Sequence, residues 1–301
     1  MSAAMKVADL VERAALRLQA AQEAGCVAFG HGTDNAFDEA AWLVLWALGL
    51  PLDDWEGAAA RAVSPADAAR CDALVTQRID SRQPAAYLTR EAWLQGIPFY
   101  VDERSIVPRS FIAELITDGS LEPWMHADPL QVLDLCTGNG SLAVLMALAY
   151  DHAQVLGADV SEEALAVARI NVERHGLQER VRLVQADGLQ GLRGSFDLIL
   201  CNPPYVNERS MADLPAEYRA EPRLALAGGA DGMDFIRPLL AGAAAALHPQ
   251  GALVLEVGNE RDHFERAFVG VSGVWLSTSA GDDQVVLLER DTLQAWAHRA
   301  S

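Results

Sequence analysis

The chain has 301 residues, of which 51% are hydrophobic and 22% are charged, a balance that is ordinary for a globular protein with an ample core. Its formal net charge is −19 and no Lys/Arg-rich run is present, which disfavours nucleic acid and favours a basic protein partner, although the acidity could serve solubility alone. No apolar stretch approaches the roughly 20 residues that cross a bilayer, and no signal layout is visible, so we expect a cytoplasmic protein that is not attached to a membrane.

The first 85 residues predict a small helical domain. Apolar residues recur at helical spacing over residues 5–23 and 38–48, and a third helix is expected over 64–81, where Ser64 and Pro65 form a cap and first turn. Residues 86–107 are aromatic and β-branched and are interrupted by Gly96 and Pro98, which is typical of a β-hairpin. The predicted domains are therefore a helical domain over 1–85, a hairpin linker over 86–107 and a third part over 108–301.

The third part alternates strands and helices after an initial helix from about Phe111. This pattern predicts an α/β fold with right-handed crossovers and a mostly parallel sheet that is covered on both faces. The last two strands are separated by only five residues, so the final strand should insert antiparallel. Strands are expected at 131–136, 154–160, 181–186, 196–201, 252–257, 272–278 and 284–290, and helices at 141–150, 161–175 and 232–247.

A glycine-containing loop follows the first strand of this sheet and precedes a helix. Glycines at 138 and 140 permit a tight turn and a close approach of the backbone to a ligand at the carboxyl edge of the sheet. The spacing of the loop does not match a P-loop, which argues against a triphosphate ligand, and it does not match the dinucleotide fingerprint either. The candidate ligand-binding residues of this loop are Cys136, Thr137, Gly138, Asn139 and Gly140.

Acidic residues end the next two strands at the same edge. Asp159, which lies 21 residues beyond Gly138, is placed to accept both hydroxyls of a ribose, with helix capping as the alternative. Asp187, followed by Gly188, could accept from the exocyclic amine of an adenine, or could be an ordinary loop acid. These strand ends together predict a nucleoside-binding site.

The fourth strand delivers the sequence Cys-Asn-Pro-Pro-Tyr to this edge. A planar NH₂ group is a poor nucleophile because its lone pair is delocalised, and the Asn202 side-chain oxygen and the Pro203 carbonyl could accept its hydrogens and free that lone pair. Tyr205 could pack on the planar group. Asn202, Pro203, Pro204 and Tyr205 are therefore the candidate catalytic residues, and Asn202 also borders the ligand site. No metal site is expected, because the histidines and cysteines lack metal-ligand spacing.

Residues 131–205 resemble a class I S-adenosylmethionine-dependent methyltransferase. The resemblance implies that residues 136–140 bind the methionine part of the cofactor, that Asp159 binds its ribose, and that Asp187 and Gly188 border its adenine. The motif of residues 202–205 occurs both in exocyclic-amine DNA methyltransferases and in HemK/PrmC-type protein glutamine methyltransferases. A module that binds the cofactor without catalysis would have no reason to keep Asn202.

Flanking segments are similar to the protein glutamine methyltransferases over about residues 80–260. Residues 82–88, 107–109 and 217–232 carry this similarity, which implies a protein substrate presented by the helical domain. Cys136 and the segment around Pro108 are similar to the branch of the family that methylates ribosomal protein L three, with Phe111 and Asn139 as small departures. A release-factor glutamine methyltransferase is the near alternative, and an adenine DNA methyltransferase is the distant one.

Overall fold

The computed structural model describes residues 5–300, and the chain divides into two compact units. The helical unit contains the residues up to Ala92 together with Leu214–Glu221. The sheet unit contains Trp93–Asp213 and the residues from Pro222 onward. The inclusion of Leu214–Glu221 in the helical unit means that the chain leaves the sheet unit after residue 213 and returns at residue 222.

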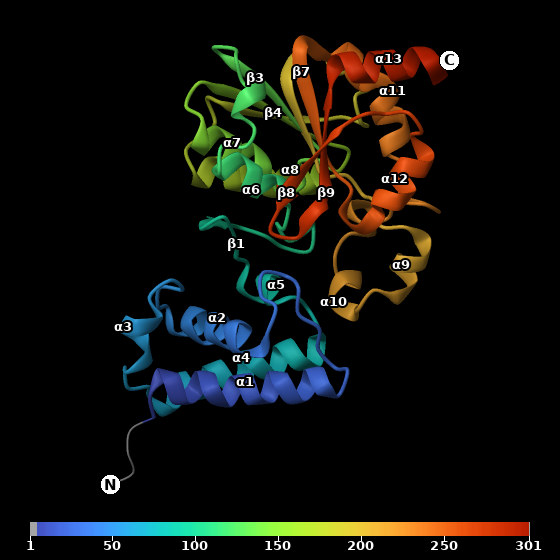
Figure 1. Ribbon diagram of the computed structural model, residues 1–301. Helices are drawn as coiled ribbons and strands as arrows, with labels where there is room; N and C mark the ends of the chain where they lie inside the picture. The colour runs from blue at the N-terminus through green and yellow to red at the C-terminus, as the bar shows by residue number, and fades with distance from the viewer. Residues whose placement is uncertain (1–4, 301) are drawn as a thin grey trace. The chain divides into compact units, whose positions relative to one another are not determined.

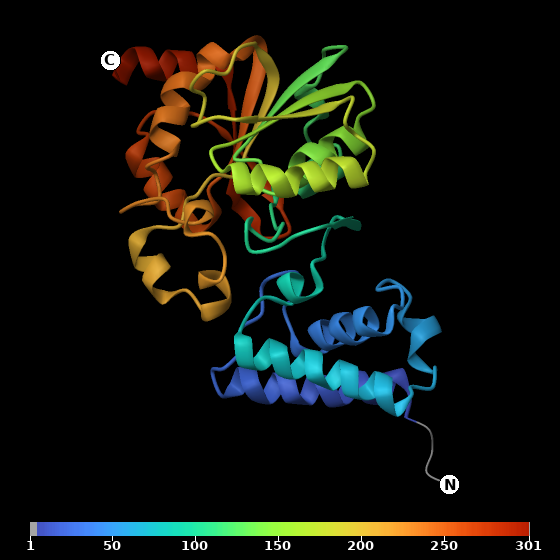
Figure 2. The ribbon, with the colours of Figure 1, turned by 180° about the vertical axis from the view of Figure 1, so that it is seen from behind.

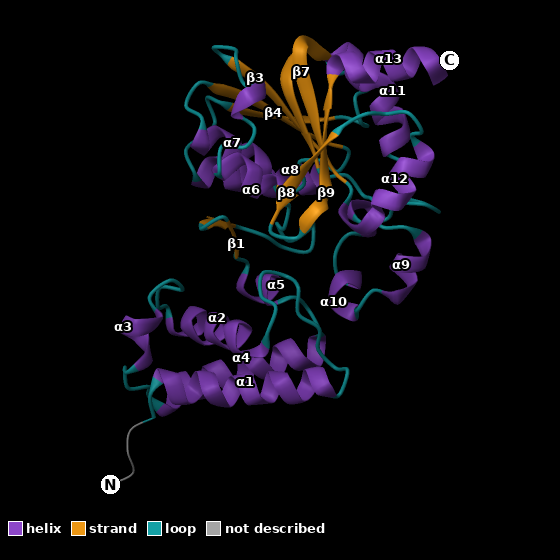
Figure 3. Ribbon diagram, viewed as in Figure 1, coloured by secondary structure: helices purple, strands orange, loops and turns teal. Residues whose placement is uncertain are grey.

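Three long helices, which contact one another, form the helical unit. Their apolar faces bury Leu10 and Leu18 of the first helix, Leu43 of the second and Val75 of the third. The expected cap is present, because the Ser64 side chain accepts from the Asp67 N–H. Figure 3 shows helices joined by loops in this unit, and the helices are α1 (Val7–Glu23), α2 (Ala36–Leu48), α3 (Trp55–Ala59), α4 (Pro65–Ser81), α5 (Ala85–Thr89) and α10 (Ala216–Arg219).

The expected hairpin is shorter than the sequence suggested. Residues 86–89, which the sequence assigns to the hairpin, form α5, and only β1 (Ala92–Leu94) and β2 (Ile97–Phe99) pair with each other. The helical turn forms because Ala85, Ala86 and Tyr87 are buried, and because the Thr89 hydroxyl donates back to the Ala85 carbonyl at 3.0 Å. Tertiary burial thus overrides the β preference of Tyr and Thr.

A seven-stranded sheet with the order β5-β4-β3-β6-β7-β9-β8 forms the centre of the sheet unit. The first five strands in this order run parallel, and β9 pairs antiparallel with β7, as the sequence predicted. The strands are β3 (Leu130–Leu135), β4 (Ala153–Asp159), β5 (Val181–Gln185), β6 (Phe196–Cys201), β7 (Leu247–Glu256), β8 (Val274–Thr278) and β9 (Gly281–Glu289).

Helices cover both faces of this sheet, as Figures 1 and 2 show. Successive residues of a strand point to opposite faces, so Val132 packs in one apolar cluster with α6 and α7, and Leu133 packs in the other with α11. The helices and short 3₁₀ turns of this unit are α6 (Ile112–Thr117), η1 (Glu122–Trp124), α7 (Ser141–Ala149), α8 (Glu162–Arg174), α9 (Glu208–Asp213), η2 (Arg223–Ala225), α11 (Ile236–Ala246), η3 (Gly258–Glu260), α12 (Arg261–Ala267) and α13 (Arg290–Ala300).

The parallel register brings the carboxyl ends of the strands to one edge. Leu135 at the end of β3 lies opposite both Ala158 of β4 and Cys201 of β6. Cys201 lies in turn opposite Leu255 of β7. Residues that follow these positions therefore emerge side by side, which is where ligands bind in open α/β sheets.

Candidate active site

The loop after β3 is held in a strained but well-bonded conformation. Gly138 and Gly140 have φ angles of 55° and 80°, and a Cβ at residue 140 would lie 3.0 Å from the Cβ of Ala168. The Asn139 side chain is buried, donates to the Ile106 carbonyl at 2.9 Å and accepts from the Ser141 N–H at 3.0 Å. Asn139 thus fixes the loop through its side chain, so only its backbone is left for a ligand.

Asp134 lies beneath this loop on β3. One carboxyl oxygen accepts from the Thr137 hydroxyl and from the Ala143 N–H, while the other, Oδ1, is buried without a partner among the described residues. Burial raises the pKa of Asp134 to about 7. A buried acceptor that has no donor is costly unless a ligand supplies one, so this position suits a positively charged group such as the ammonium of an amino acid.

Asp159 ends β4 and is linked to the glycine loop. Its Oδ2 accepts from the Gly138 N–H at 2.9 Å, and its Oδ1 accepts from the Ser161 N–H at the same distance. The cap of α8 is Ser161, whose hydroxyl accepts from the Ala164 N–H. Burial raises the pKa of Asp159. The structure therefore brings Asp159 to the loop, as the sequence predicted, and assigns the capping role to a different residue.

Asp187 and Gly188 lie in the turn after β5, where the Asp187 side chain accepts from the Gln190 amide at 3.1 Å. Both residues line a cavity of about 430 Å³ between this turn and α11. Its other walls are mainly apolar and include Leu189 and Phe235, and among the described residues its lining does not include the glycine loop. The cavity has the apolar surface that a flat heterocycle requires.

Two cysteines connect the glycine loop to the end of β6. The neighbouring Cys201 thiol, together with burial, raises the pKa of the Cys136 thiol well above its usual value. Cys136 has a φ of 62°, a left-handed conformation that side chains other than glycine rarely adopt. The first residue of the predicted cofactor loop therefore lies directly beside the residue that precedes Asn202.

Asn202 is half-buried at the end of β6, and its side-chain amide has no hydrogen-bond partner within the part of the chain that the structure describes. Glycines hold the backbone that follows. A Cβ at Gly228 would lie 2.8 Å from the Pro204 carbonyl oxygen, and one at Gly232 would lie 2.2 Å from that of Tyr205. The motif is thus rigidly mounted while the Asn202 amide remains available to a ligand.

Tyr205 packs against the turn that follows β7. A Cβ at Gly258 would lie 2.5 Å from Cε2 of Tyr205, so the ring lies directly on the Gly258 backbone. The Tyr205 hydroxyl donates to Glu256 Oε1 at 3.3 Å. Asn207, two residues further on, donates to Glu260 at 2.6 Å. Glu256 at the end of β7 and Glu260 in the turn that follows therefore hold the segment that carries the motif.

Sequence reasoning did not single out Asp134 or Glu256. A signal was available for both, because each is an acid in the last positions of an otherwise apolar strand, where an unpaired charge is expensive. Among the described residues, no group of three or more His, Cys, Asp or Glu side chains could hold a metal ion. Within the same residues, every helix is too short or too polar to cross a bilayer.

Comparisons with known proteins identify methyltransferases among the relatives of this chain. A family model described as "Methyltransferase small domain" matches residues 121–217. A protein of Bordetella pertussis (strain Tohama I) named "Ribosomal protein uL3 glutamine methyltransferase" is 53% identical over 289 residues, which cover 95% of each chain. A protein of Burkholderia pseudomallei with the same name is 50% identical and covers 97% of this chain and 96% of its own.

Among solved structures, the hMettl16 catalytic domain in complex with a MAT2A 3'UTR hairpin is similar in fold. It superposes with a TM-score of 0.51 at 13% sequence identity and covers 76% of this chain and 84% of its own. At this identity the likeness concerns the fold alone. The central sheet with an antiparallel strand next to β7 is therefore a class I methyltransferase fold.

Proposed function

Since this chain belongs to the family of ribosomal protein uL3 glutamine methyltransferases, we propose that it transfers a methyl group to the side-chain amide nitrogen of a glutamine in uL3, the protein L three expected from the sequence. The cofactor is S-adenosylmethionine, which supplies a methyl group activated by a positively charged sulfonium. The observation that carries the mechanism is the free amide of Asn202 on a rigid backbone.

We assign Asn202 and Pro203 the task of orienting the substrate amide. An amide nitrogen is a weak nucleophile because its lone pair is shared with the carbonyl. The Asn202 oxygen and the Pro203 carbonyl each accept one N–H, which turns the lone pair out of conjugation and aims it. Pro204 stiffens the turn, and the Tyr205 ring packs on the amide plane. No base is required before transfer, because the proton can leave afterwards.

The residues around the glycine loop suit the cofactor. Asp134 Oδ1 is a buried acceptor without a donor, which fits the cofactor's ammonium group. The backbone of residues 136–140 allows close approach, and Asp159 has the carboxylate that a ribose requires. Asp187 and Gly188 border an apolar cavity that fits an adenine. Each assignment rests on the chemistry of the residues that would contact that part of the cofactor.

The acidity of the chain supports a basic protein as its substrate. With a formal net charge of −19, the protein attracts a ribosomal protein and repels nucleic acid at long range. Modification of a ribosomal protein also supports a cytoplasmic location for the reaction. A release factor is the second candidate, because the motif at residues 202–205 can orient any glutamine amide.

The substrate is tested by offering the purified chain tritiated S-adenosylmethionine with uL3, a release factor or duplex DNA in separate reactions. We expect label on uL3, retained in a glutamine side chain after digestion. Label on the release factor alone would change the assigned substrate, and label on DNA alone would refute protein methylation.

The role of Asn202 is tested by Asn202→Ala, with Asn259→Ala as a matched control. Asn259 is an exposed asparagine near the same edge, where it accepts from the Gln284 side chain at 3.3 Å. Loss of orientation should lower kcat of Asn202→Ala by about a hundredfold. The control should retain the wild-type rate. A wild-type rate in Asn202→Ala would refute the orienting mechanism.

A further inference from the structure

Glu256 is a buried acid at the end of β7, and its hydrogen-bond donors among the described residues are neutral. Its side chain is 1% exposed. Glu256 Oε2 accepts from the Ser110 hydroxyl at 2.6 Å and from the Phe111 N–H at 2.9 Å, and Oε1 accepts from the Tyr205 hydroxyl at 3.3 Å. One carboxyl group thus connects three segments that lie far apart in the sequence.

The Glu256 carboxyl is expensive for the fold. Burial raises its pKa to about 7, which shows that the ionised form is disfavoured there. Its donors offset part of this cost, because each of them would otherwise lack this acceptor. The contact with Tyr205 shows what the carboxyl holds besides the fold.

The contact with Tyr205 restricts the orientation of that ring. The backbone of Tyr205 is held because Gly232 packs against its carbonyl, and one edge of the ring lies on Gly258. The hydrogen bond to Glu256 opposes rotation of the side chain away from Gly258. The other oxygen of Glu256 is anchored by Ser110 and Phe111, so the carboxyl cannot follow the ring.

We propose that Glu256 is a positioning residue that fixes the Tyr205 ring in the orientation that packs on the substrate amide. This inference rests on the proposed function, because it assigns the way in which one of the proposed catalytic residues is aimed. Glu256 itself does not touch the substrate. Its effect on the reaction passes through the Tyr205 hydroxyl, and this requirement distinguishes it from a residue that only supports the fold.

A double-mutant cycle tests this dependence, with kcat measured at saturating uL3 and S-adenosylmethionine. Tyr205→Phe keeps the ring and removes the hydroxyl, and Glu256→Ala removes the acceptor. Each should lower kcat about tenfold, which corresponds to one lost hydrogen bond, with little change in KM. The double variant should be no slower than either single variant. Effects that multiply in the double variant would overturn the proposal.

Two further variants separate positioning from general damage. In Glu256→Gln the amide oxygen can keep the contacts to Ser110 and Phe111 while the NH₂ donates to the Tyr205 hydroxyl oxygen. A hydrogen bond to Tyr205 therefore remains, and kcat should return to within about threefold of the wild type. It also keeps the test decisive if Glu256→Ala does not fold. Ser110→Ala removes one of the two anchors of the Glu256 carboxyl and leaves the Phe111 N–H, so it should lower kcat less than Glu256→Ala does. A Gln variant as slow as Ala would contradict the proposal.

A readout without methylation separates this proposal from the proposed function. The chain has five tyrosines, so fluorotyrosine labelling and the Tyr205→Phe variant assign the ¹⁹F resonance of Tyr205. We expect a single Tyr205 resonance in the wild type and a shifted or divided Tyr205 resonance in Glu256→Ala. An unchanged resonance would refute the positioning role. A wild type that methylates no uL3 but shows the expected resonances would refute only the proposed function.

Discussion

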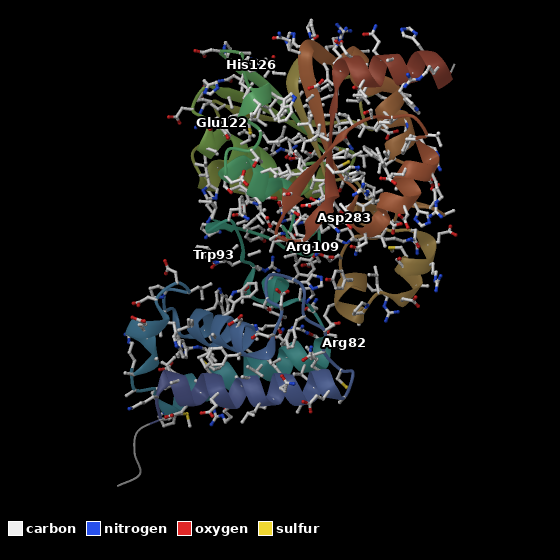
Figure 4. The ribbon with its side chains drawn as sticks, in the orientation of Figure 1. Arg82, Trp93, Arg109, Glu122, His126 and Asp283 are labelled. Atoms are coloured by element: carbon white, nitrogen blue, oxygen red, sulfur yellow. The ribbon has the colours of Figure 1, made fainter. Side chains whose placement is uncertain are left out.

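Arg78 and Glu217 are 139 positions apart in the chain, yet Arg78 Nη1 donates to Glu217 Oε1 at 3.3 Å inside the helical unit. Their side chains are 1% and 0% exposed. Arg82, whose side chain is labelled in Figure 4, adds a contact to Glu217 at 2.9 Å, and the Ala28 N–H adds one at 3.0 Å. Glu39 accepts from Arg78 Nε at 2.8 Å. This ion network attaches Leu214–Glu221 to the helices.

Replacing Glu217 by Gln should destabilise the protein. Buried Arg78 keeps Glu39 but loses its second carboxylate, and half-buried Arg82 loses its charged partner. Hydrogen bonds to charged groups contribute about 1.5 to 3 kcal/mol each, so we expect a loss of about 3 kcal/mol of unfolding free energy. The matched control is Glu265→Gln, which removes an exposed pair with Arg261 and should cost less than about 0.5 kcal/mol. Urea unfolding of both variants provides the comparison, and equal losses would contradict the assigned weight of the network.

Gly232→Ala should impair both folding and catalysis. Residue 232 has a φ of 82°, and a Cβ there would lie 2.2 Å from the Tyr205 carbonyl oxygen, so the segment that carries the motif must move. Gly176 is a suitable control, because its φ of 67° is similar and no atom lies within 4 Å of its added Cβ. Gly176→Ala should therefore lose only the free energy that alanine needs to adopt a left-handed conformation, about 1 to 2 kcal/mol, and should keep its methylation rate.

For Gly232→Ala we expect the same backbone cost and, in addition, a loss of kcat of about a hundredfold from displacement of the motif. Thermal midpoints measure the loss of stability in the two variants, and initial rates measure the loss of catalysis. If both variants lose rate equally, close packing against Tyr205 is not what requires glycine at residue 232.

Local patterns made most of the sheet unit predictable from the sequence. The alternation of strands and helices, the short connection before β9 and the turn after Cys201 each depend on neighbouring residues, and the observed elements agree within a few positions. The error at residues 86–89 arose where burial of Tyr87 decides the conformation. Local pattern did not show that Glu217 contacts Arg78, or that Glu256 contacts Ser110 across 146 positions. Such contacts follow from the tertiary fold.

Asp159→Asn should weaken binding of S-adenosylmethionine. The two carboxyl oxygens of Asp159 accept from the Gly138 and Ser161 N–H groups, and an amide can replace only one of these acceptors. The amide NH₂ would face a backbone donor and disturb the glycine loop, at a cost of about 1 to 3 kcal/mol in binding free energy. Calorimetric titration with the cofactor measures this loss. Asp187→Asn is the comparison, because among the described residues the Asp187 carboxyl contacts only the Gln190 side-chain amide. A larger loss of affinity in Asp187→Asn than in Asp159→Asn would show that Asp187 contributes more to cofactor binding.

The pKa of Glu256 predicts how stability depends on pH. Burial raises this pKa from 4.5 to about 7 in the folded protein. Between these values the unfolded chain releases the proton while the folded protein keeps it, so the stabilising contribution is complete below about pH 4.5 and is lost as pH rises towards 7. At about 1.4 kcal/mol per pKa unit, the loss is about 3 kcal/mol.

Glu256→Gln removes this titration, so the unfolding free energy of the variant minus that of the wild type should rise by this amount from pH 4.5 to 7.5. Urea unfolding across this range measures the difference, with Glu265→Gln as an exposed control whose difference should stay nearly constant. Parallel curves for Glu256→Gln and the wild type would show that the carboxyl is already ionised in the folded protein at pH 5.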